Sequence, residues 1–519
     1  MTQDVVAVRP TPVSAKEKVG YALGDTATNF VWRAIIVFLP FFLTDAAGIG
    51  PAAVGVLLLV CRVWDGVTDI GMGFVADRTS TRWGKFRPWI LWTAIPFGIL
   101  GVLTFSTPDL GPTGRLVYAY VTYSALIVLY TMSNVPYSSL MGVMSPSPTE
   151  RGSISSYRFV FAFLGGLFLQ GFTPPLLAAL RDPAATRARA QAALHAGGLG
   201  SWLEGAFHSV LYGIATFFDT PFWHSLYGHG LGFPYSATMT FFAVIAIVLF
   251  VVTFLATRER VRPVVEKQSV GQDFSDLLHN GPWLVLFAVG ILFVTFTTLK
   301  NGVIMYYFAY YVGNRELAAA FMVAGLLGAM LGAAITGSLI RVMGKRRLML
   351  YSIVLGLVSS ALLYLPGPRD TAAMFTFSTI TEFSTGPMVT LFFAMLADTA
   401  DFSEWRTHRR ATGLFYSAGT VAMKFGSGVG GALTGLFLAV FGYAAVSGGQ
   451  EAVVQSAGAI HGIRLLISVF PAAVALLMLV AFWFYSLDEH RLSEIERDLA
   501  VRRAGPGSAA GRAAVQPAG

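Results

Sequence analysis

The stretch GFVADRTSTRWGKFRP, residues 73–88, and a shorter counterpart, GSLIRVMGKRRL at residues 337–348, decide the fold. Each begins with a glycine, continues through a short apolar step and ends in a basic turn that contains Gly-Lys. Each also follows a long apolar run, near 52–76 in the first case and near 317–340 in the second. Because many membrane folds are built from internal repeats that survive as weak sequence symmetry, the pair predicts a chain of two similar halves.

Charged residues are scarce along the whole chain. Of the 519 residues, 55% are hydrophobic and only 12% are charged, and the mean hydropathy is +0.63. A soluble domain usually carries about 25% charged residues. So little charge could not cover so much apolar surface in water, and we therefore expect a lipid bilayer to be the solvent for most of the chain.

Twelve apolar runs are long enough for the roughly 20 residues that a spanning helix needs. They predict an all-α membrane protein with twelve transmembrane helices in two six-helix, pseudo-symmetric halves. The runs fall near residues 19–44, 52–76, 88–106, 115–143, 154–180, 236–257, 282–311, 317–340, 348–366, 372–397, 411–441 and 462–487.

The charged stretch between the sixth and seventh runs predicts a linker between the two halves. The boundaries that follow are an N-terminal tail at 1–17, a first half at 18–258, a linker at 259–280, a second half at 281–488 and a C-terminal tail at 489–519.

A long polar segment at 181–235 interrupts the first half. It contains WLEGAFHSVLYGIATFF, in which Glu204 and His208 break an otherwise apolar run. We expect this run to form an interfacial or re-entrant helix in an external loop. The alternative is a thirteenth span, which would place the basic residues of every later loop on the outside.

Basic residues collect in alternate loops, which places those loops and both termini in the cytoplasm by the positive-inside rule. This orientation accounts for the net charge of +8 better than a nucleic-acid partner does, and it indicates a multi-pass protein of the cell inner membrane. The residues on this side are Lys16, Lys18, Arg78, Arg82, Lys85, Arg87, Arg258, Arg260, Arg262, Lys267, Arg341, Lys345, Arg346, Arg347, Arg406, Arg409 and Arg410.

Two carboxylates lie inside the second apolar run, in CRVWDGVTDIGMG. Asp65 and Asp69 are four residues apart and therefore share a helical face. In a low dielectric they cannot both stay charged without a counterion, so one takes a proton or a cation binds. Thr68 adds a hydroxyl on nearly the same face, and such oxygen ligands suit Na⁺ or a proton. The alternative is a structural ion pair with Arg62, although one arginine would not neutralise both acids.

Polar side chains also share faces on the first and fourth runs. In the fourth run Thr131 and Asn134 are three residues apart, and in the first Asp25, Asn29 and Arg33 recur every four residues. Amides suit sugar hydroxyls because they donate and accept hydrogen bonds. The alternatives are interhelical hydrogen bonds for the amides and, for Arg33, snorkelling or a pair with an acid such as Glu382.

Ionisable residues near the ends of runs are candidates for gate salt bridges. No nucleotide-binding loop, hydrolase elbow, metalloprotease motif or cysteine pair is present, so we expect no enzyme activity, no cofactor and no metal beyond a transported cation. The gate candidates are Asp77, Arg78, Asp398 and Asp401.

Five motifs resemble the glycoside–pentoside–hexuronide:cation symporters, a group of the major facilitator superfamily that includes the melibiose carrier. They are GYALGDTATNF, CRVWDGVTDIGMGFVADRTSTRWGKFRPW, NVPYSSL, ERGSISSYRFVFA and MLADTADFSEWRTHRRATGLFYSAGTVAMKFGSG. The resemblance runs from about residue 18 to 490 and is interrupted by the segment 181–235.

The resemblance implies a cation site and a sugar site. The cation site would be Asp65, Thr68, Asp69 and Thr131, and the sugar site would include Asn29, Tyr130, Asn134, Arg158 and Lys424. The melibiose carrier has Asn in place of Thr68, Asp in place of both Asn29 and Asn134, and an aromatic residue in place of Ser138. These departures leave the cation, Na⁺, H⁺ or Li⁺, and the sugar open.

The resemblance therefore implies a secondary active transporter that takes up a glycoside, pentoside or hexuronide together with a monovalent cation by alternating access, and we expect it to be a monomer. Arg33 joins the expected substrate site because a guanidinium recognises a carboxylate, which keeps an acidic sugar open beside neutral ones. Two alternatives are a lysolipid or amphiphile carrier on the same fold and a transport-inactive sensor.

Overall fold

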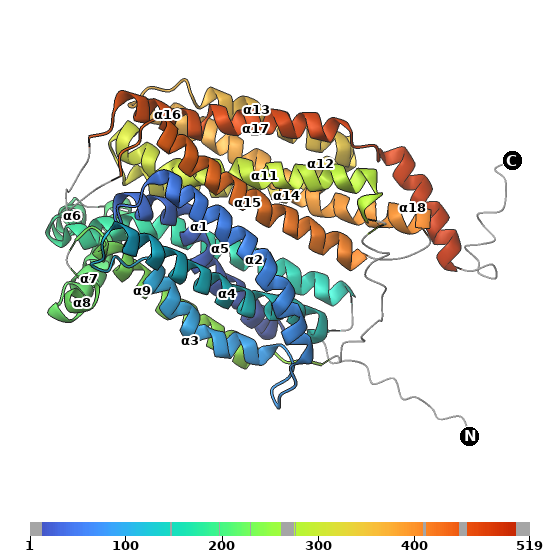
Figure 1. The fold of residues 1–519 in the computed structure, drawn as a ribbon, viewed down its shortest axis with the longest axis horizontal. Helices are drawn as coiled ribbons and strands as arrows, with labels where there is room; N and C mark the ends of the chain where they lie inside the picture. Colours follow the sequence, from blue (N-terminus) through green and yellow to red (C-terminus); the bar gives the residue numbers. More distant parts are fainter. Residues whose placement is uncertain are drawn as a thin grey trace.

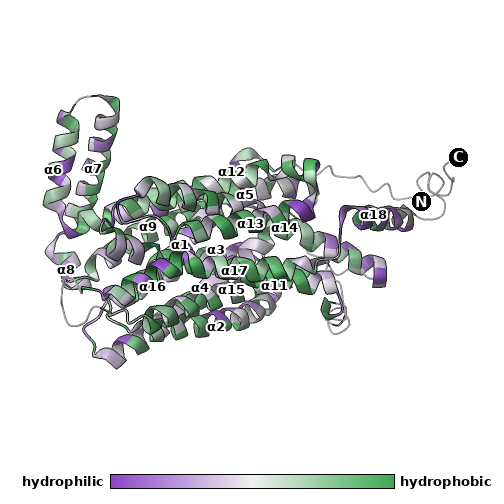
Figure 2. Ribbon diagram, turned by 90° about the horizontal axis from the view of Figure 1, so that it is seen from above, coloured by the Kyte–Doolittle hydropathy of each residue, from purple (hydrophilic) through white to green (hydrophobic). Residues whose placement is uncertain are grey.

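The computed structural model describes residues 13–145, 148–196, 198–228, 230–260, 275, 277–407, 412–445 and 454–504. Its long helices run side by side, and Figure 1 shows the first half (blue to green) packed against the second half (yellow to red). The all-α prediction is confirmed within these residues. Figure 2 shows apolar residues along the whole length of the bundle, as expected for helices that face lipid.

Six long helices form the first half, and each lies on one of the predicted apolar runs. Proline stands in the first turn of several, where its missing N–H has no intrahelical partner to lose. The helices are α1 (Ala15–Asp45), α2 (Pro51–Arg78), α3 (Arg87–Thr104), α4 (Pro112–Met144), α5 (Pro148–Arg181) and α9 (Phe233–Ala256).

The second half repeats this arrangement and then adds a helix outside it. A short π-helix, η1, prolongs α11, and the last predicted span is divided into α16 and α17. The elements are α11 (Gly281–Tyr306), η1 (Tyr307–Val312), α12 (Leu317–Met343), α13 (Lys345–Leu362), α14 (Thr371–Thr407), α15 (Thr412–Val440), α16 (Ala457–Ile467), α17 (Val469–Trp483) and the terminal α18 (Glu489–Ala504).

Within the described residues, eleven segments are long and apolar enough to cross a membrane. The remaining predicted run, 348–366, forms α13, which begins with Lys345, Arg346 and Arg347 and so carries three positive charges in its first turn. Because α13 packs against α14 and α17, it occupies the place of the twelfth helix in the bundle.

Between α5 and α9 the chain forms three helices. These are α6 (Pro183–His195), α7 (Leu199–Phe218) and α8 (Pro221–Tyr227). Of these, α7 lies on the run WLEGAFHSVLYGIATFF, where a helix was expected. In Figure 2, α6 and α7 stand as a pair across one end of the bundle, roughly perpendicular to the long helices. We call this end the hairpin end and the opposite one, where α18 lies, the α18 end.

The two Gly-Lys turns that suggested a repeat share one structural device. After α9, the Glu259 carboxylate accepts hydrogen bonds from the backbone N–H groups of Lys85, Phe86 and Arg87 at 2.8–3.0 Å, at the start of α3. After α17, Glu489 accepts from the backbone N–H of Arg346 at 3.3 Å, in the first turn of α13. In each half, a carboxylate beyond the last helix therefore caps the third helix, where the exposed N–H groups favour negative charge.

Glycine is required at both turns. Gly84 has φ +114° and Gly344 has φ +79°, values that side-chain-bearing residues rarely adopt. A Cβ at Gly84 would lie 2.5 Å from the Glu259 carboxyl group, and a Cβ at Gly344 would overlap the Glu489 carboxylate. The glycine that the two turns share thus makes room for a side chain that comes from the end of the same half.

At the hairpin end the two halves are in close contact. Gly55 of α2 lies against Gly435 of α15, and a Cβ on either would overlap the backbone of the other helix. On α1, Asp45 accepts hydrogen bonds from Tyr310 of η1 and, at 2.6 Å, from Tyr443, which follows α15. Burial and the nearby Asp45 raise the pKa of Tyr443, so its phenol keeps the proton that it donates.

We expect the Glu259 cap to matter for stability. Glu259→Gln and Gly84→Ala should each lower the free energy of unfolding by about 1–3 kcal/mol, because the first weakens charge-assisted hydrogen bonds and the second adds strain and a clash. Thermal unfolding of the purified protein measures the effect. Gly142→Ala is the matched control, because nothing lies within 4 Å of its new Cβ. Equal midpoints for Gly84→Ala and Gly142→Ala would contradict the prediction.

Candidate functional site

The carboxylate pair of α2 lies midway along the bundle. Asp65 is fully buried, whereas the Asp69 side chain is 26% exposed. On α4, the Thr131 hydroxyl lies 3.3 Å from Asp65 Oδ1, 3.1 Å from Asp69 Oδ1 and 3.3 Å from the Thr68 hydroxyl. The four residues expected to hold a cation therefore converge, with four oxygen-bearing side chains from two neighbouring helices.

Two positive side chains hold this pair in the structure. Lys424 Nζ of α15 lies 3.1 Å from Asp65 Oδ1 and also contacts Asp69 Oδ2. Arg62, one turn before Asp65, donates to Asp65 Oδ2 at 3.4 Å. The family resemblance implied that Lys424 belongs to the substrate site. The spacing of the residues offered Arg62 alone as a structural partner for the two acids. The structure instead supplies two cations for two acids, one from each half of the molecule.

An aromatic pair lies beside the charged cluster. Trp32 of α1 and Tyr130 of α4 stack with centroids 4.2 Å apart. The Arg62 guanidinium lies 4.1 Å over the Trp32 ring, and Lys424 Nζ lies 5.9 Å from the Tyr130 centroid. Tyr130, expected at the substrate site, is thus in contact with the site expected for the cation.

The remaining expected substrate residues lie on the inner helices of the first half. Asn29 donates to the Asp25 backbone carbonyl at 2.8 Å, and Arg158 pairs with the Asp25 side chain at 3.2 Å. Asn134 is partly buried, one turn beyond Thr131. Arg158 therefore already has a protein partner.

Arg33 is a partly buried cation on α1 with no hydrogen bond or ion pair to another described residue. Its guanidinium packs on Gly166 of α5, and Glu382 and Asp25 are the carboxylates near enough to attract it. Glu382 itself pairs with Lys300 at 3.1 Å. The direct Arg33–Glu382 pair considered from the sequence is therefore not formed in the described part of the chain.

Three of the four gate candidates have described side chains. Lys345 binds both carboxylate oxygens of Asp398 at 2.7 Å, Asp401 follows on α14 and takes part in a further interaction, and Arg78 ends α2 in an exposed position. The Asp77 side chain lies outside the described residues. Because Lys345 and Asp398 belong to the same half, their pair alone closes no passage between halves.

Sequence reasoning missed the contact around Asp45 at the hairpin end. Asp45 also accepts a hydrogen bond from Thr44 at 2.6 Å, and Thr44 is 2.8 Å from the Tyr306 hydroxyl of α11. An acid at the end of the first apolar run and the tyrosine-rich YYFAYYV at 306–312 were the available signals. Among described residues, the polar links between halves are those at Thr44 and Asp45, Arg189–Glu316 and Lys424 with its two acids.

Comparison with solved structures shows the fold. A bacterial homologue of the human lysosomal transporter Spinster, in an inward-facing and unoccupied conformation, matches with a TM-score of 0.61 at 16% identity, over 93% of this chain and 99% of the other. The nucleoside transporter NupG matches with a TM-score of 0.55 at 11% identity, over 91% and 100%.

Comparison of sequences identifies the relatives. The putative glycoside/cation symporter YagG of Escherichia coli is 32% identical over 96% of this chain and 98% of that protein. The isoprimeverose transporter of Lactiplantibacillus pentosus is 31% identical over 94% and 92%, and the glucuronide carrier protein homolog of E. coli is 29% identical over 93% and 95%.

The family described as MFS/sugar transport protein matches residues 20–489. This match covers both halves, including the carboxylate pair and the lysine that joins them. The chain therefore belongs to the MFS/sugar transport protein family, and it is a multi-pass membrane transporter and not an enzyme.

Proposed function

We propose that the protein is a secondary active transporter that couples the inward movement of a sugar or glycoside to that of a monovalent cation, Na⁺ or H⁺. The observation that carries the proposal is the contact of Lys424 with Asp65 and Asp69. An ammonium group held by two carboxylates and beside a hydroxyl occupies the kind of place that a small cation would take.

Lys424 gives the site a way to link cation binding to movement. In the structure it supplies one of the two positive charges beside the acids, and it does so from the opposite half, whereas Arg62 supplies the other from α2 itself. A Na⁺ ion or a proton would supply the charge of Lys424 from within the first half. Lys424 would then be released from α2, and its contact between the halves would be lost. Cation binding thereby changes the relative stability of two arrangements of the halves, which is the requirement for alternating access.

The sugar side of the proposal rests on neighbouring groups. Trp32 and Tyr130 present aromatic surface, and Asn134 lies one helical turn from Thr131. A cation held by Thr131 would fix α4 and so preset Asn134 for a sugar hydroxyl. The names of the relatives, a glycoside/cation symporter and an isoprimeverose transporter, support the same substrate class.

The two alternatives have less support from the described residues. A carrier of lysolipids or other amphiphiles would be expected to place apolar groups between its halves, whereas here Lys424, Arg62 and two carboxylates meet there. A transport-inactive sensor would not need the carboxylate pair. Uptake of labelled glycosides into vesicles separates all three possibilities.

Neutralising either member of the carboxylate pair should abolish cation-driven accumulation. With Asp65→Asn or Asp69→Asn, one Lys424 charge is enough for the remaining acid, so no external cation is required. Uptake into vesicles with and without an inward Na⁺ or proton gradient measures this. Facilitated exchange should persist, since the sugar groups remain. Asp109→Asn, an exposed acid of the same half, is the control, and wild-type uphill transport in either site variant would remove the pair from the mechanism.

Cation and sugar should raise each other's affinity by one common factor. Thermodynamic linkage requires this reciprocity, and the shared helix α4, with Thr131 and Asn134 one turn apart, provides the physical route. Calorimetric titrations of each ligand, with and without the other, give the two factors. Unequal factors would mean that a further bound species takes part, and two factors of one would disprove the coupling.

Arg33→Gln should weaken acidic sugars selectively if the central site takes a hexuronide. Losing a charged hydrogen-bond donor should cost about tenfold or more in affinity for a glucuronide and leave the matched glucoside unchanged. Competition of transport by the matched pair, in wild type and variant, measures the selectivity. Arg341→Gln, at the exposed end of α12, serves as the control. Equal loss for both sugars, or lower expression with an unchanged ranking, would assign Arg33 a structural role.

A further inference from the structure

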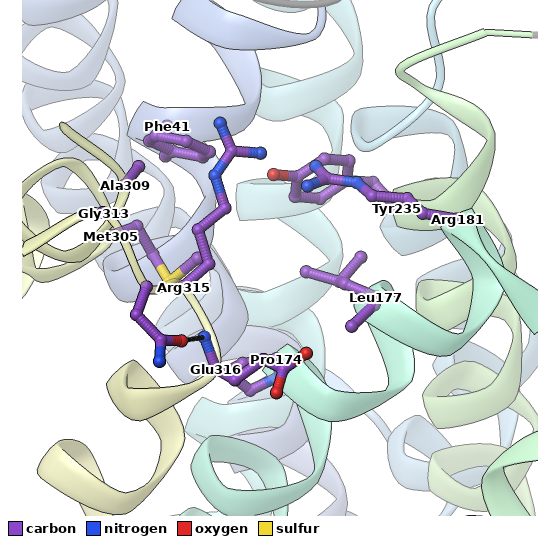
Figure 3. A pocket seen from close by; sticks show the side chains of 12 residues that line it. Phe41, Pro174, Leu177, Arg181, Tyr235, Met305, Ala309, Gly313, Arg315 and Glu316 are labelled. Atoms are coloured by element: carbon purple, nitrogen blue, oxygen red, sulfur yellow. Dashed lines mark hydrogen bonds between the residues drawn. The ribbon is translucent and has the colours of Figure 1, made fainter. Parts of the chain in front are cut away.

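A cavity of about 400 Å³ lies between the halves near the hairpin end. Figure 3 shows it from close by. The first half contributes helices α1, α5 and α9, and the second half contributes the end of α11, η1 and the turn before α12. The lining residues that matter here are Phe41, Leu177, Arg181, Tyr235, Met305 and Arg315.

Two guanidinium groups reach this cavity from opposite halves. Arg181 ends α5, and its Cζ lies 5.9 Å from the Tyr235 ring centroid; Arg315 stands in the turn before α12, and its Cζ lies 5.6 Å from the Phe41 ring centroid. In Figure 3 the two side chains extend toward each other from the two sides of the cavity. In the described part of the chain neither arginine has an ion pair, so each retains most of its donors for another partner.

The third polar group in the cavity is a buried phenol. Tyr235, in the first turn of α9, is 3% exposed, and its hydroxyl makes no hydrogen bond of normal geometry to a described residue, although the Arg181 guanidinium lies close to it. An unsatisfied buried hydroxyl costs about 1–3 kcal/mol. Both guanidinium groups are close enough to act on it electrostatically, and in Figure 3 its oxygen points toward Arg315.

The acids near the cavity do not balance these charges. Glu316 lines the wall but is paired with Arg189 of α6. Asp45 is close enough to attract Arg315, yet its oxygens already accept from tyrosine and threonine hydroxyls. Arg181, Arg189 and Arg315 carry three positive charges, and Glu316 and Asp45 carry at most two negative charges. The group therefore has a net charge of at least +1. The competing explanation is that Arg315 only offsets Asp45, and the experiment below separates the two.

We propose that this cavity binds an oxyanion, such as a sulfate, phosphate or carboxylate group, through Arg181, Arg315 and the Tyr235 hydroxyl. Guanidinium groups bind such anions with paired, planar hydrogen bonds, and a phenol can donate one more. The anion would relieve the repulsion between two like charges and satisfy the buried hydroxyl. Because Arg181 and Arg315 belong to different halves, the bound anion would also hold the hairpin end closed.

This site is separate from the carboxylate pair and does not depend on the proposed symport. Its ligand can come from two sources, a soluble anion or the phosphate of an anionic lipid headgroup. The full-length protein is therefore placed in nanodiscs of zwitterionic lipid alone, and its thermal midpoint is followed as sodium sulfate replaces sodium chloride at constant ionic strength. A second set of nanodiscs contains phosphatidylglycerol and no sulfate.

Sulfate also stabilises proteins by exclusion from their surface, so the variants carry the test. Arg181→Gln and Arg315→Gln should each weaken the sulfate dependence by about tenfold or more in concentration, the effect of losing a charged hydrogen-bond donor. Arg187→Gln is the matched control, because Arg187 lies on α6 over the Tyr212 ring and not in the cavity. It should keep the full response.

Tyr235→Phe gives a second, independent readout. Removing an unsatisfied hydroxyl should leave the anion-free protein as stable as wild type or more stable, while the response to sulfate should weaken. If the ligand is a lipid headgroup, phosphatidylglycerol should stabilise wild type, sulfate should add nothing further, and both arginine variants should lose the effect. If the ligand is a soluble anion, the response to sulfate should be the same in either lipid.

The proposal is overturned if wild type, Arg181→Gln, Arg315→Gln and Tyr235→Phe respond equally to sulfate and equally to phosphatidylglycerol. If Arg315→Gln alone lowers the midpoint, by the same amount with and without either anion, Arg315 only offsets Asp45 and the oxyanion site is likewise excluded. The symport proposal is unaffected by these outcomes, since it is tested by uptake in the Asp65 and Asp69 variants.

Discussion

One lysine, paired with two acids of the other half, organises the middle of this molecule. Lys424 of α15 reaches Asp65 and Asp69 of α2, where two acids close together in a low dielectric require positive charge. Both acids belong to the first half, where Arg62 supplies one positive charge, and the second half supplies the other through Lys424. A cation or proton that binds Asp65 or Asp69 in place of Lys424 would weaken the attraction between the halves. Cation binding at α2 and the arrangement of the two halves would therefore be coupled.

The hairpin end supports this by a different kind of contact. Gly55 and Gly435 allow the backbones of α2 and α15 to lie in contact. Asp45 accepts hydrogen bonds from the hydroxyl groups of Tyr310 in η1 and Tyr443 after α15. These contacts are short-range and depend on fit, whereas the pair at Lys424 is electrostatic. In the described state, packing therefore holds the halves together at the hairpin end, and the ion pairs of Lys424 hold them together in the middle. Only the ion pairs can be replaced directly by a small cation.

Local rules were enough to predict part of this arrangement. Four-residue spacing alone places Asp65 and Asp69 on one face, and the apolar runs give the helices of both halves. Spacing does not say which helix will face that pair, so the position of Lys424 was not predictable, because it depends on how α15 packs on α2. Asp45 and its tyrosines were missed for the same reason. The helix expected over WLEGAFHSVLYGIATFF is present as α7, whereas α6 and α8 were missed because short helices have no strong length signal.

The capping of α3 by Glu259 and of α13 by Glu489 has a consequence for the connection between the halves. Each cap fastens the end of one half to an earlier part of the same half, and Glu259 thus acts structurally with the first half although it stands where the linker was expected to begin. Each cap therefore lies within one half, and neither uses a contact across the link between the halves. A covalent link of this kind raises the effective concentration of each half for the other, and a break within it would leave both of these caps intact.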